Sequence, residues 1–110
     1  MAKLEKTLNE SFDSVLRRVD NAVMQSVSAT LEDSVDWHTS EARCSVRVYE
    51  RYSYMGGNRV SMNVTVFQAG NGPVRVCAIT SGGSQAMFFK VNTWGEETFL
   101  ETLKDIVRNL

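Results

Sequence analysis

Three stretches of the chain alternate apolar and polar residues with a period of two, the pattern of β-strands that bury one face. A shorter stretch, centred on Ala29, has the same alternation. Gly-rich segments separate the longer stretches, and short connections of this kind join antiparallel neighbours. The sequence therefore predicts an antiparallel meander whose longer strands cover residues 43–52, 60–67 and 74–79.

In two further stretches, apolar residues recur every three or four positions, which is typical of an amphipathic helix. The first covers about residues 10–25, with Asn9 or Ser11 as its N-cap, and the second covers about residues 94–109. Each helix must bury its apolar stripe, and one face of the sheet offers the surface. We expect a single α+β domain, 1–110: a two-layer sandwich of about five strands with both helices on one face. A short additional strand over residues 3–8 is left open.

Turn length decides which residues of neighbouring strands face each other. A three-residue loop at 56–58 places Val48 opposite Val66, so both apolar sets share the core face. A two-residue turn at Gly82-Gly83 places Ala78 opposite Met87, which predicts a last hairpin over residues 74–91. The polar residues 33–41 are expected to form a loop.

The second face of this sheet is left without a helix, and it is predicted to carry arginine and aromatic side chains. Arginines among aromatics bind anions and stack on planar rings; a merely solvated polar face is the alternative interpretation. Apolar residues on an exposed face favour a partner surface, most simply that of a homodimer. The candidate binding residues are Arg47, Tyr49, Arg51, Phe67, Arg75 and Phe88.

The tip of the predicted last hairpin offers a second candidate site. Ser84 and Gln85 follow Gly82-Gly83 and present a hydroxyl and an amide together. The segment lacks the spacing of a phosphate-binding loop or a dinucleotide fingerprint. An anionic small molecule at this tip, or in a pocket between helices and sheet, is the alternative function.

Several classes of function find no support in the sequence. His38 is the one histidine, no G-x-S-x-G occurs, and the carboxylates are not paired, so we assign no catalytic residue, metal or cofactor. Cys44 and Cys77 lack metal-site spacing and are expected on opposite faces of the sheet. Glu50 is expected on the core face, or at the sheet margin beside an arginine. A non-enzymatic binding module is therefore favoured.

Charge and hydropathy constrain the partners and the location. Residues 41–90 carry six basic and two acidic side chains, but the formal net charge of the chain is −1. The acidic flanks weaken long-range attraction to a polyanion, which disfavours nucleic acid. The N-terminus has no apolar run long enough for a leader or a membrane span, so a cytoplasmic location without membrane contact is expected.

Four segments together resemble a family of short uncharacterised bacterial proteins that is known as a domain of unknown function. The resemblance extends over nearly the whole chain. It implies a bacterial cytoplasmic protein, and it implies no activity, cofactor or catalytic residue. The segments that carry it are residues 31–34, 47–54, 78–86 and 95–100.

Overall fold

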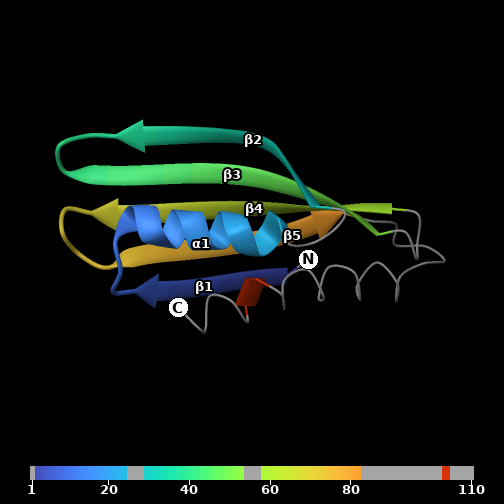
Figure 1. Ribbon diagram of the computed structural model, residues 1–110, viewed down its shortest axis with the longest axis horizontal. Helices are drawn as coiled ribbons and strands as arrows, with labels where there is room; N and C mark the ends of the chain where they lie inside the picture. Colours follow the sequence, from blue (N-terminus) through green and yellow to red (C-terminus); the bar gives the residue numbers. More distant parts are fainter. Residues whose placement is uncertain (1, 25–28, 54–57, 83–102, 105–110) are drawn as a thin grey trace.

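The computed structural model describes residues 2–24, 29–53, 58–82 and 103–104. Five strands form one antiparallel sheet in the order β1-β5-β4-β3-β2, so that β1 and β2 are its two edges (Figure 1). One helix, α1, follows β1 and leads to β2. The bounds are β1 Ala2–Leu8, α1 Phe12–Met24, β2 Ala29–His38, β3 Ala42–Ser53, β4 Asn58–Ala69 and β5 Val74–Gly82.

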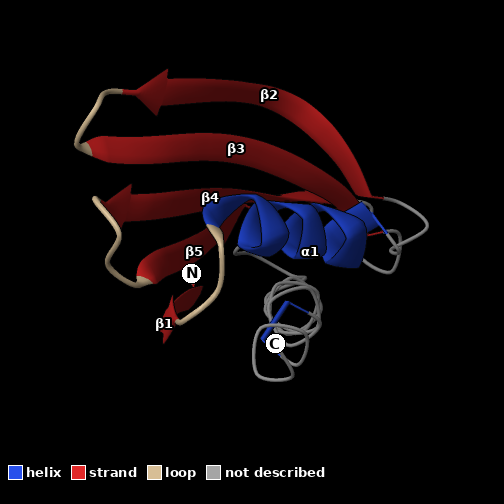
Figure 2. Ribbon diagram, turned by 60° about the vertical axis from the view of Figure 1, so that its left-hand side comes forward, coloured by secondary structure: helices blue, strands red, loops and turns tan. Residues whose placement is uncertain are grey.

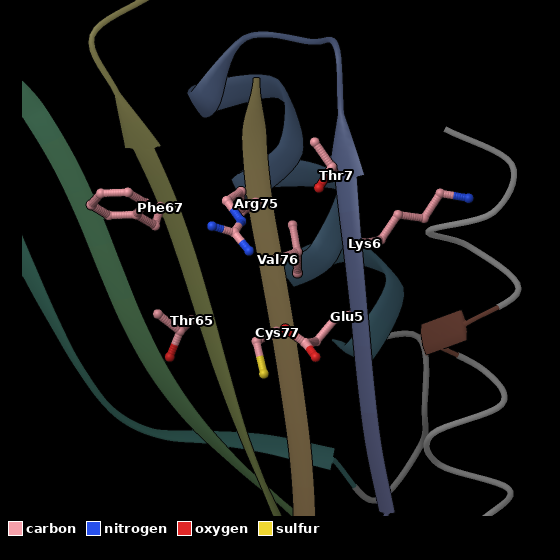
Figure 3. A pocket seen from close by; sticks show the side chains of 8 residues that line it. All are labelled: Glu5, Lys6, Thr7, Thr65, Phe67, Arg75, Val76 and Cys77. Atoms are coloured by element: carbon pink, nitrogen blue, oxygen red, sulfur yellow. The ribbon is translucent and has the colours of Figure 1, made fainter. Parts of the chain in front are cut away.

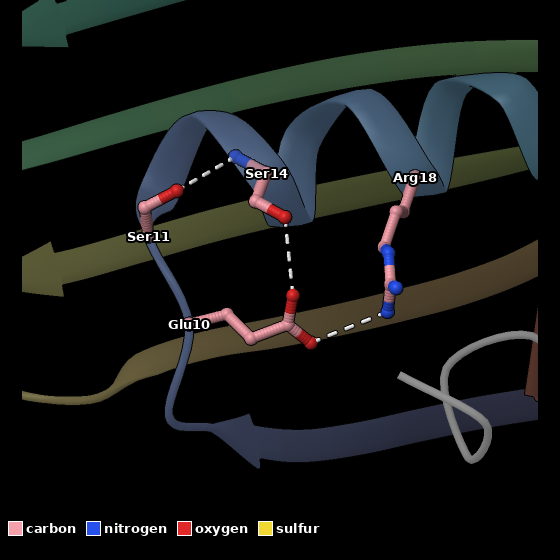
Figure 4. A network of polar contacts seen from close by, with 4 residues as sticks. All are labelled: Glu10, Ser11, Ser14 and Arg18. Atoms are coloured by element: carbon pink, nitrogen blue, oxygen red, sulfur yellow. Dashed lines mark hydrogen bonds and ion pairs between the residues drawn. The ribbon is translucent and has the colours of Figure 1, made fainter.

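Helix α1 lies along the sheet on the side toward which the strands curve (Figure 2). Its predicted bounds and the Ser11 cap are confirmed: Ser11 Oγ accepts a hydrogen bond of 3.1 Å from the backbone N–H of Ser14. Glu10 extends this network, because its carboxylate accepts from Ser14 Oγ at 3.1 Å and from Arg18 at 3.4 Å (Figure 4). These contacts fix the point at which the chain leaves β1 and crosses the sheet.

The additional strand considered at residues 3–8 is present as β1. It occupies the edge of β5 with which the second strand of the predicted hairpin would have to pair. β1 pairs with β5 from Ala2↔Thr80 to Leu8↔Val74, while β4 pairs with the other edge of β5. Both edges of β5 are therefore occupied, and the predicted pairing of Ala78 with Met87 is wrong. The predicted partner strand itself, residues 87–91, lies outside the described residues.

The β3–β4 register also differs from the prediction. Tyr49 pairs with Met62 and Arg47 with Val64, so the apolar set of β4 faces the arginine and tyrosine set of β3. Val48 pairs with Asn63 and lies on the opposite face. Four residues, 54–57, separate the paired ends Ser53 and Asn58, in place of the three that the prediction assumed. One residue of difference exchanges the two faces of a strand.

The predicted loop 33–41 is also wrong, because β2 continues through Asp33 to His38. Every residue of β2 after Ala29 is exposed. A strand at the edge of a sheet that is bare on both faces needs no apolar alternation, which explains why the pattern did not reveal it. An irregularity between Leu31 and Asp33 leaves Glu32 out of the ladder.

The core lies between α1 and the central strands β4 and β5. Val15, Val19 and Val23 of the helix pack against the alternating valines of β4 and β5, and Leu103 joins the same cluster. The predicted helix 94–109 lies outside the described residues except for Leu103 and Lys104. The buried apolar residues contributed by the two strands are Val60, Met62, Val64, Val66, Val74, Val76 and Ala78.

Candidate functional site

A polar cluster joins α1 to β3 on the helix-covered face of the sheet. Tyr49 is fully buried, and its hydroxyl donates a hydrogen bond of 2.9 Å to Asp20 Oδ1. The Arg47 guanidinium lies 3.6 Å from the same oxygen. Burial, and then the bond to Asp20, raise the pKa of Tyr49 far above its usual value of 10.0. Tyr49 is therefore a neutral hydrogen-bond donor, which serves the contact between helix and sheet.

A second acidic residue of α1 makes a similar contact with β3, four residues before Arg47. Asp13 Oδ1 lies 2.8 Å from Arg43, whose guanidinium also lies 4.3 Å from the centre of the Phe12 ring. The hydrogen bond and charge of Arg43 lower the pKa of Asp13 below its usual value of 3.8. Asp13 and Asp20 thus explain why β3 presents polar residues to the helix.

The structure divides the predicted binding set between the two faces. Arg47, Tyr49 and Arg51 lie on the helix-covered face, so the prediction that they share a face with Phe67 and Arg75 is wrong. Phe67 and Arg75 pair directly on the face that α1 does not cover, as predicted. Phe88, Ser84 and Gln85 lie outside the described residues. Arg75 pairs with Phe67 of β4 on one side and with Thr7 of β1 on the other.

We call the side of the sheet opposite α1 the open face. Its side chains form rows across the strands, because directly paired residues point to the same side. Four rows, each written from β2 toward β1, follow from the strand registers: Trp37–Cys44–Phe67–Arg75–Thr7, Val35–Val46–Thr65–Cys77–Glu5, Asp33–Val48–Asn63–Ile79–Lys3 and Thr30–Glu50–Ser61–Ser81.

The open face exposes several large apolar side chains. Trp37 is 59% exposed, and Val35, Phe67 and Ile79 are each about 40% exposed. Val46, Val48 and Cys44 lie between them and are half-buried. Contiguous apolar surface of this kind marks contact sites on soluble proteins. The contribution of β2 to this face was not predicted, although Val35 and Trp37 are spaced by two residues, which is typical of a strand.

A hollow of about 210 Å³ opens on the face beside β5. Arg75 and Phe67 face each other across it, with Cys77, Thr65 and Glu5 nearby (Figure 3). None of the ion pairs among the described residues involves Arg75. The hollow therefore offers an unpaired cation and an aromatic ring together, which suits an anion or a second aromatic group.

A second hollow, of about 140 Å³, lies beside β2. Val35, Val46 and Val48 form most of it, and Asp33 and Ser34 complete its lining. An apolar floor with a carboxylate at its margin suits a long side chain that ends in a cation.

Two expectations about single residues are corrected. Cys44 and Cys77 are both free thiols, and they lie on the same face of the sheet rather than on opposite faces. Glu50 lies on the open face rather than the core face, where its carboxylate contacts Arg59 at 2.9 Å. The expected pairing of Glu50 with an arginine is therefore confirmed, on the inner strand β3 rather than at the sheet margin.

In the described part of the chain, no group of three or more His, Cys, Asp and Glu side chains could hold a metal ion. No helix there is long and apolar enough to cross a membrane.

Comparison with known proteins places the chain in a family. Residues 1–110 match the family of unknown function DUF6054 over their full length. The chain belongs to DUF6054. No curated protein matches it. Among solved structures, the chain is similar to PA94 from Pseudomonas aeruginosa, a protein of unknown function provisionally described as a regulator. That similarity has a TM-score of 0.48 and 13% identity over 88% of this chain and 78% of PA94.

Proposed function

We propose that the protein is a non-enzymatic interaction module whose contact surface is the open face. The observation that carries the proposal is the apolar surface around Phe67, which α1 does not cover. Trp37 and Val35 extend this surface to the edge strand β2, and Ile79 extends it toward β1. Fully hydrated large apolar side chains are costly, and a protein partner removes that cost.

The two faces of the sheet support this assignment by their contrast. On the helix-covered face, Arg43 and Arg47 are paired with Asp13 and Asp20 of α1. These arginines are engaged in holding the fold and are poorly placed to bind a partner. The open face instead combines exposed apolar residues with an unengaged Arg75, a combination found at the centre of protein interfaces.

Site-specific photo-crosslinking in the cells of origin tests the proposal. A benzophenone amino acid replaces Phe67, and a control protein carries it at Arg17, an exposed position on α1. We expect a discrete covalent adduct from position 67 that is lost when Ile79→Glu is added. Equal adducts from both positions, or none from position 67, would contradict the proposal.

A second candidate function is the binding of a small planar anion in the hollow at Arg75. The unpaired guanidinium, the Phe67 ring and the nearby Thr65 hydroxyl favour it. Benzoate and inorganic phosphate are suitable probes in a thermal-shift titration. We expect the wild-type protein and Arg59→Gln to be stabilised and Arg75→Gln to show no shift. Arg59 is a matched control because it lies on the same strand-paired sheet but is engaged by Glu50. An unchanged melting temperature for the wild-type protein would reject this candidate.

A further inference from the structure

We infer that the partner of the open face is a second copy of this chain, packed face to face about a two-fold axis that runs along β4. The inference rests on the proposed function and names its partner. It assigns a complementary group to each of the two hollows: Trp37 of one copy to the hollow at Arg75, and Lys3 of one copy to the hollow at Asp33.

The order of the strands supplies the geometry. β4 is the middle strand of five. Rotation about an axis along β4 therefore places each row opposite the same row of the second copy, with the order of the strands reversed. Phe67 then lies opposite Phe67 of the second copy, and Asn63 lies opposite Asn63. Stacked sheets pack about 10 Å apart, close enough for such side chains to interdigitate. At the centre of the contact, the Phe67 rings of the two copies therefore meet in the first row, and the Asn63 amides meet in the third row.

In the first row, reversal brings Trp37 over Thr7 and beside Arg75 of the second copy. Trp37 is the most exposed large apolar side chain among the described residues, at 59%. The hollow beneath it holds Arg75 and Phe67, and Arg75 has no ion pair there. An indole stacked on this guanidinium combines apolar burial with a cation–π contact. The most exposed ring thus meets the hollow best suited to receive it.

In the third row, reversal brings Lys3 over Asp33 of the second copy. Both are exposed at the ends of the row, and the hollow of Val35, Val46 and Val48 lies next to Asp33. The lysine stem can cover the valines while its ammonium reaches the carboxylate. Aligned sheets cross at about 30°, so the axis is inclined by about 15° to β4, and the ends of a row are displaced by about 5 Å, within reach of a lysine side chain. The two-fold axis forms this ion pair twice.

The charge of the face agrees with self-association. Its three cations are balanced by three carboxylates, so two copies do not repel each other; the six residues are Lys3, Arg59, Arg75, Glu5, Asp33 and Glu50. Pairing of two copies through their β2 edges is the competing arrangement. That ladder would gather six carboxylates, because Glu32, Asp33 and Asp36 occur in each strand and no lysine or arginine does. Like charges across a ladder oppose pairing, which favours the face over the edge.

The extent of the face is adequate for a stable contact. Five strands at about 4.8 Å spacing, with four rows about 6.8 Å apart, give roughly 500 Å² of flat area on each copy. Side-chain relief increases the accessible area that is buried, toward the roughly 800 Å² per partner of standard interfaces.

Charge reversal of the lysine–aspartate pair tests the arrangement on the whole chain. The dissociation constant of the dimer is measured by light scattering and sedimentation for wild type, Lys3→Asp, Asp33→Lys and the double variant. Across the interface each single reversal creates two like-charge contacts, so we expect roughly tenfold weaker association. Lys3→Asp also removes the exposed 3.7 Å pair with Glu5 within its own strand, and the melting temperature measures that separate effect. The double variant restores two opposite pairs, and we expect it to recover most of the loss. Arg17→Asp on α1 is the control of similar charge change and leaves the constant unaltered.

The failures of this inference and of the proposed function are distinguishable. A wild-type protein that stays monomeric at all concentrations overturns the second copy as partner, while a crosslink from position 67 to another protein leaves the interaction module in place. A dimer that the single reversals weaken and the double variant does not restore overturns the two-fold arrangement. Thermal melts of each variant at low concentration establish that the monomer remains folded, since both positions are exposed.

Discussion

Tyr49 of β3 donates its hydroxyl hydrogen to Asp20 of α1 at 2.9 Å, and this bond ties the helix to a strand whose facing side chains are mostly polar. The contact has a direct consequence for alkaline stability. The folded state raises the pKa of Tyr49, so above pH 10 the unfolded chain loses a proton that the folded chain keeps. The stabilisation is complete below pH 10 and decreases as pH rises further.

Tyr49→Phe tests this link. We expect the variant to lose about 1–2 kcal/mol of unfolding free energy at pH 7, because a buried bond to a carboxylate is removed. Its stability should then decline less between pH 9 and pH 11 than that of the wild type. Urea denaturation across this pH range provides the measurement. Parallel alkaline profiles for the two proteins would contradict the role assigned to Tyr49.

The two aspartates of α1 are predicted to differ in their importance. Asp20 contacts the largely buried Arg47, whose side chain is 17% exposed, whereas the pair of Asp13 and Arg43 is open to water. Asp20→Asn leaves a guanidinium without its partner, and we expect a loss of about 2 kcal/mol, less than for a fully buried pair. Asp13→Asn should leave the denaturation midpoint nearly unchanged. Equal effects of the two substitutions would count against this difference.

Gly82 ends β5 with a φ of +117°, and a Cβ placed there would lie 2.9 Å from the carbonyl oxygen of Arg59. Gly82→Ala should cost about 3 kcal/mol, from backbone strain and the clash together. Gly70 is the matched control, because its φ is +57° and its Cβ position is unobstructed. We expect Gly70→Ala to cost about 1 kcal/mol. Thermal denaturation of both variants measures the difference, and similar midpoints would contradict it.

The β3–β4 register makes a prediction about two valines. Val64 is fully buried beneath α1, whereas Val48 lies half-buried on the open face. In the monomer, Val64→Ala should cost about 2 kcal/mol and Val48→Ala less than about 1 kcal/mol. Under the register first expected from the sequence, both valines would belong to the core. Urea denaturation at protein concentrations too low for a dimer to form measures the loss of unfolding free energy in each variant. Equal losses would favour the other register.

Local signals in the sequence predicted α1 well. The spacing of its apolar residues and the Ser11 cap act within a few residues, so neither depends on the rest of the fold. The strands β3, β4 and β5 were also predicted as strands, because alternation is a local property. Family membership was anticipated from short sequence segments and is confirmed over residues 1–110.

Relations between elements were harder to predict. The β3–β4 register depends on one residue of turn length, and two apolar sets of similar strength left both faces of β3 acceptable. The deciding information lay on α1, where Asp13 and Asp20 are spaced by seven residues and meet Arg43 and Arg47. Reading helix and strand together could have found the correct face.

The candidate site was predicted in part for the same reason. Phe67 and Arg75 were placed correctly on the open face, since β4 and β5 have unambiguous apolar sets. Trp37 and Asp33 were missed because β2 is exposed on both faces, and exposure on both faces removes the alternation by which strands are found. The spacing of Val35 and Trp37 by two residues is the one local signal of this strand.

In the proposed dimer, two copies meet through their open faces with β4 at the axis. Cysteine crosslinking at Phe67 tests this arrangement, in a background where Cys44→Ser and Cys77→Ser remove the native thiols. Because stacked sheets lie about 10 Å apart, which is too far for a disulfide, a short bismaleimide serves as the crosslinker, and we expect Phe67→Cys to form a covalent dimer with it. Thr7→Cys and Trp37→Cys should crosslink efficiently only when mixed with each other. Covalent dimers from Arg17→Cys at the same rate as from Phe67→Cys, or no dimer from Phe67→Cys, would contradict the claim.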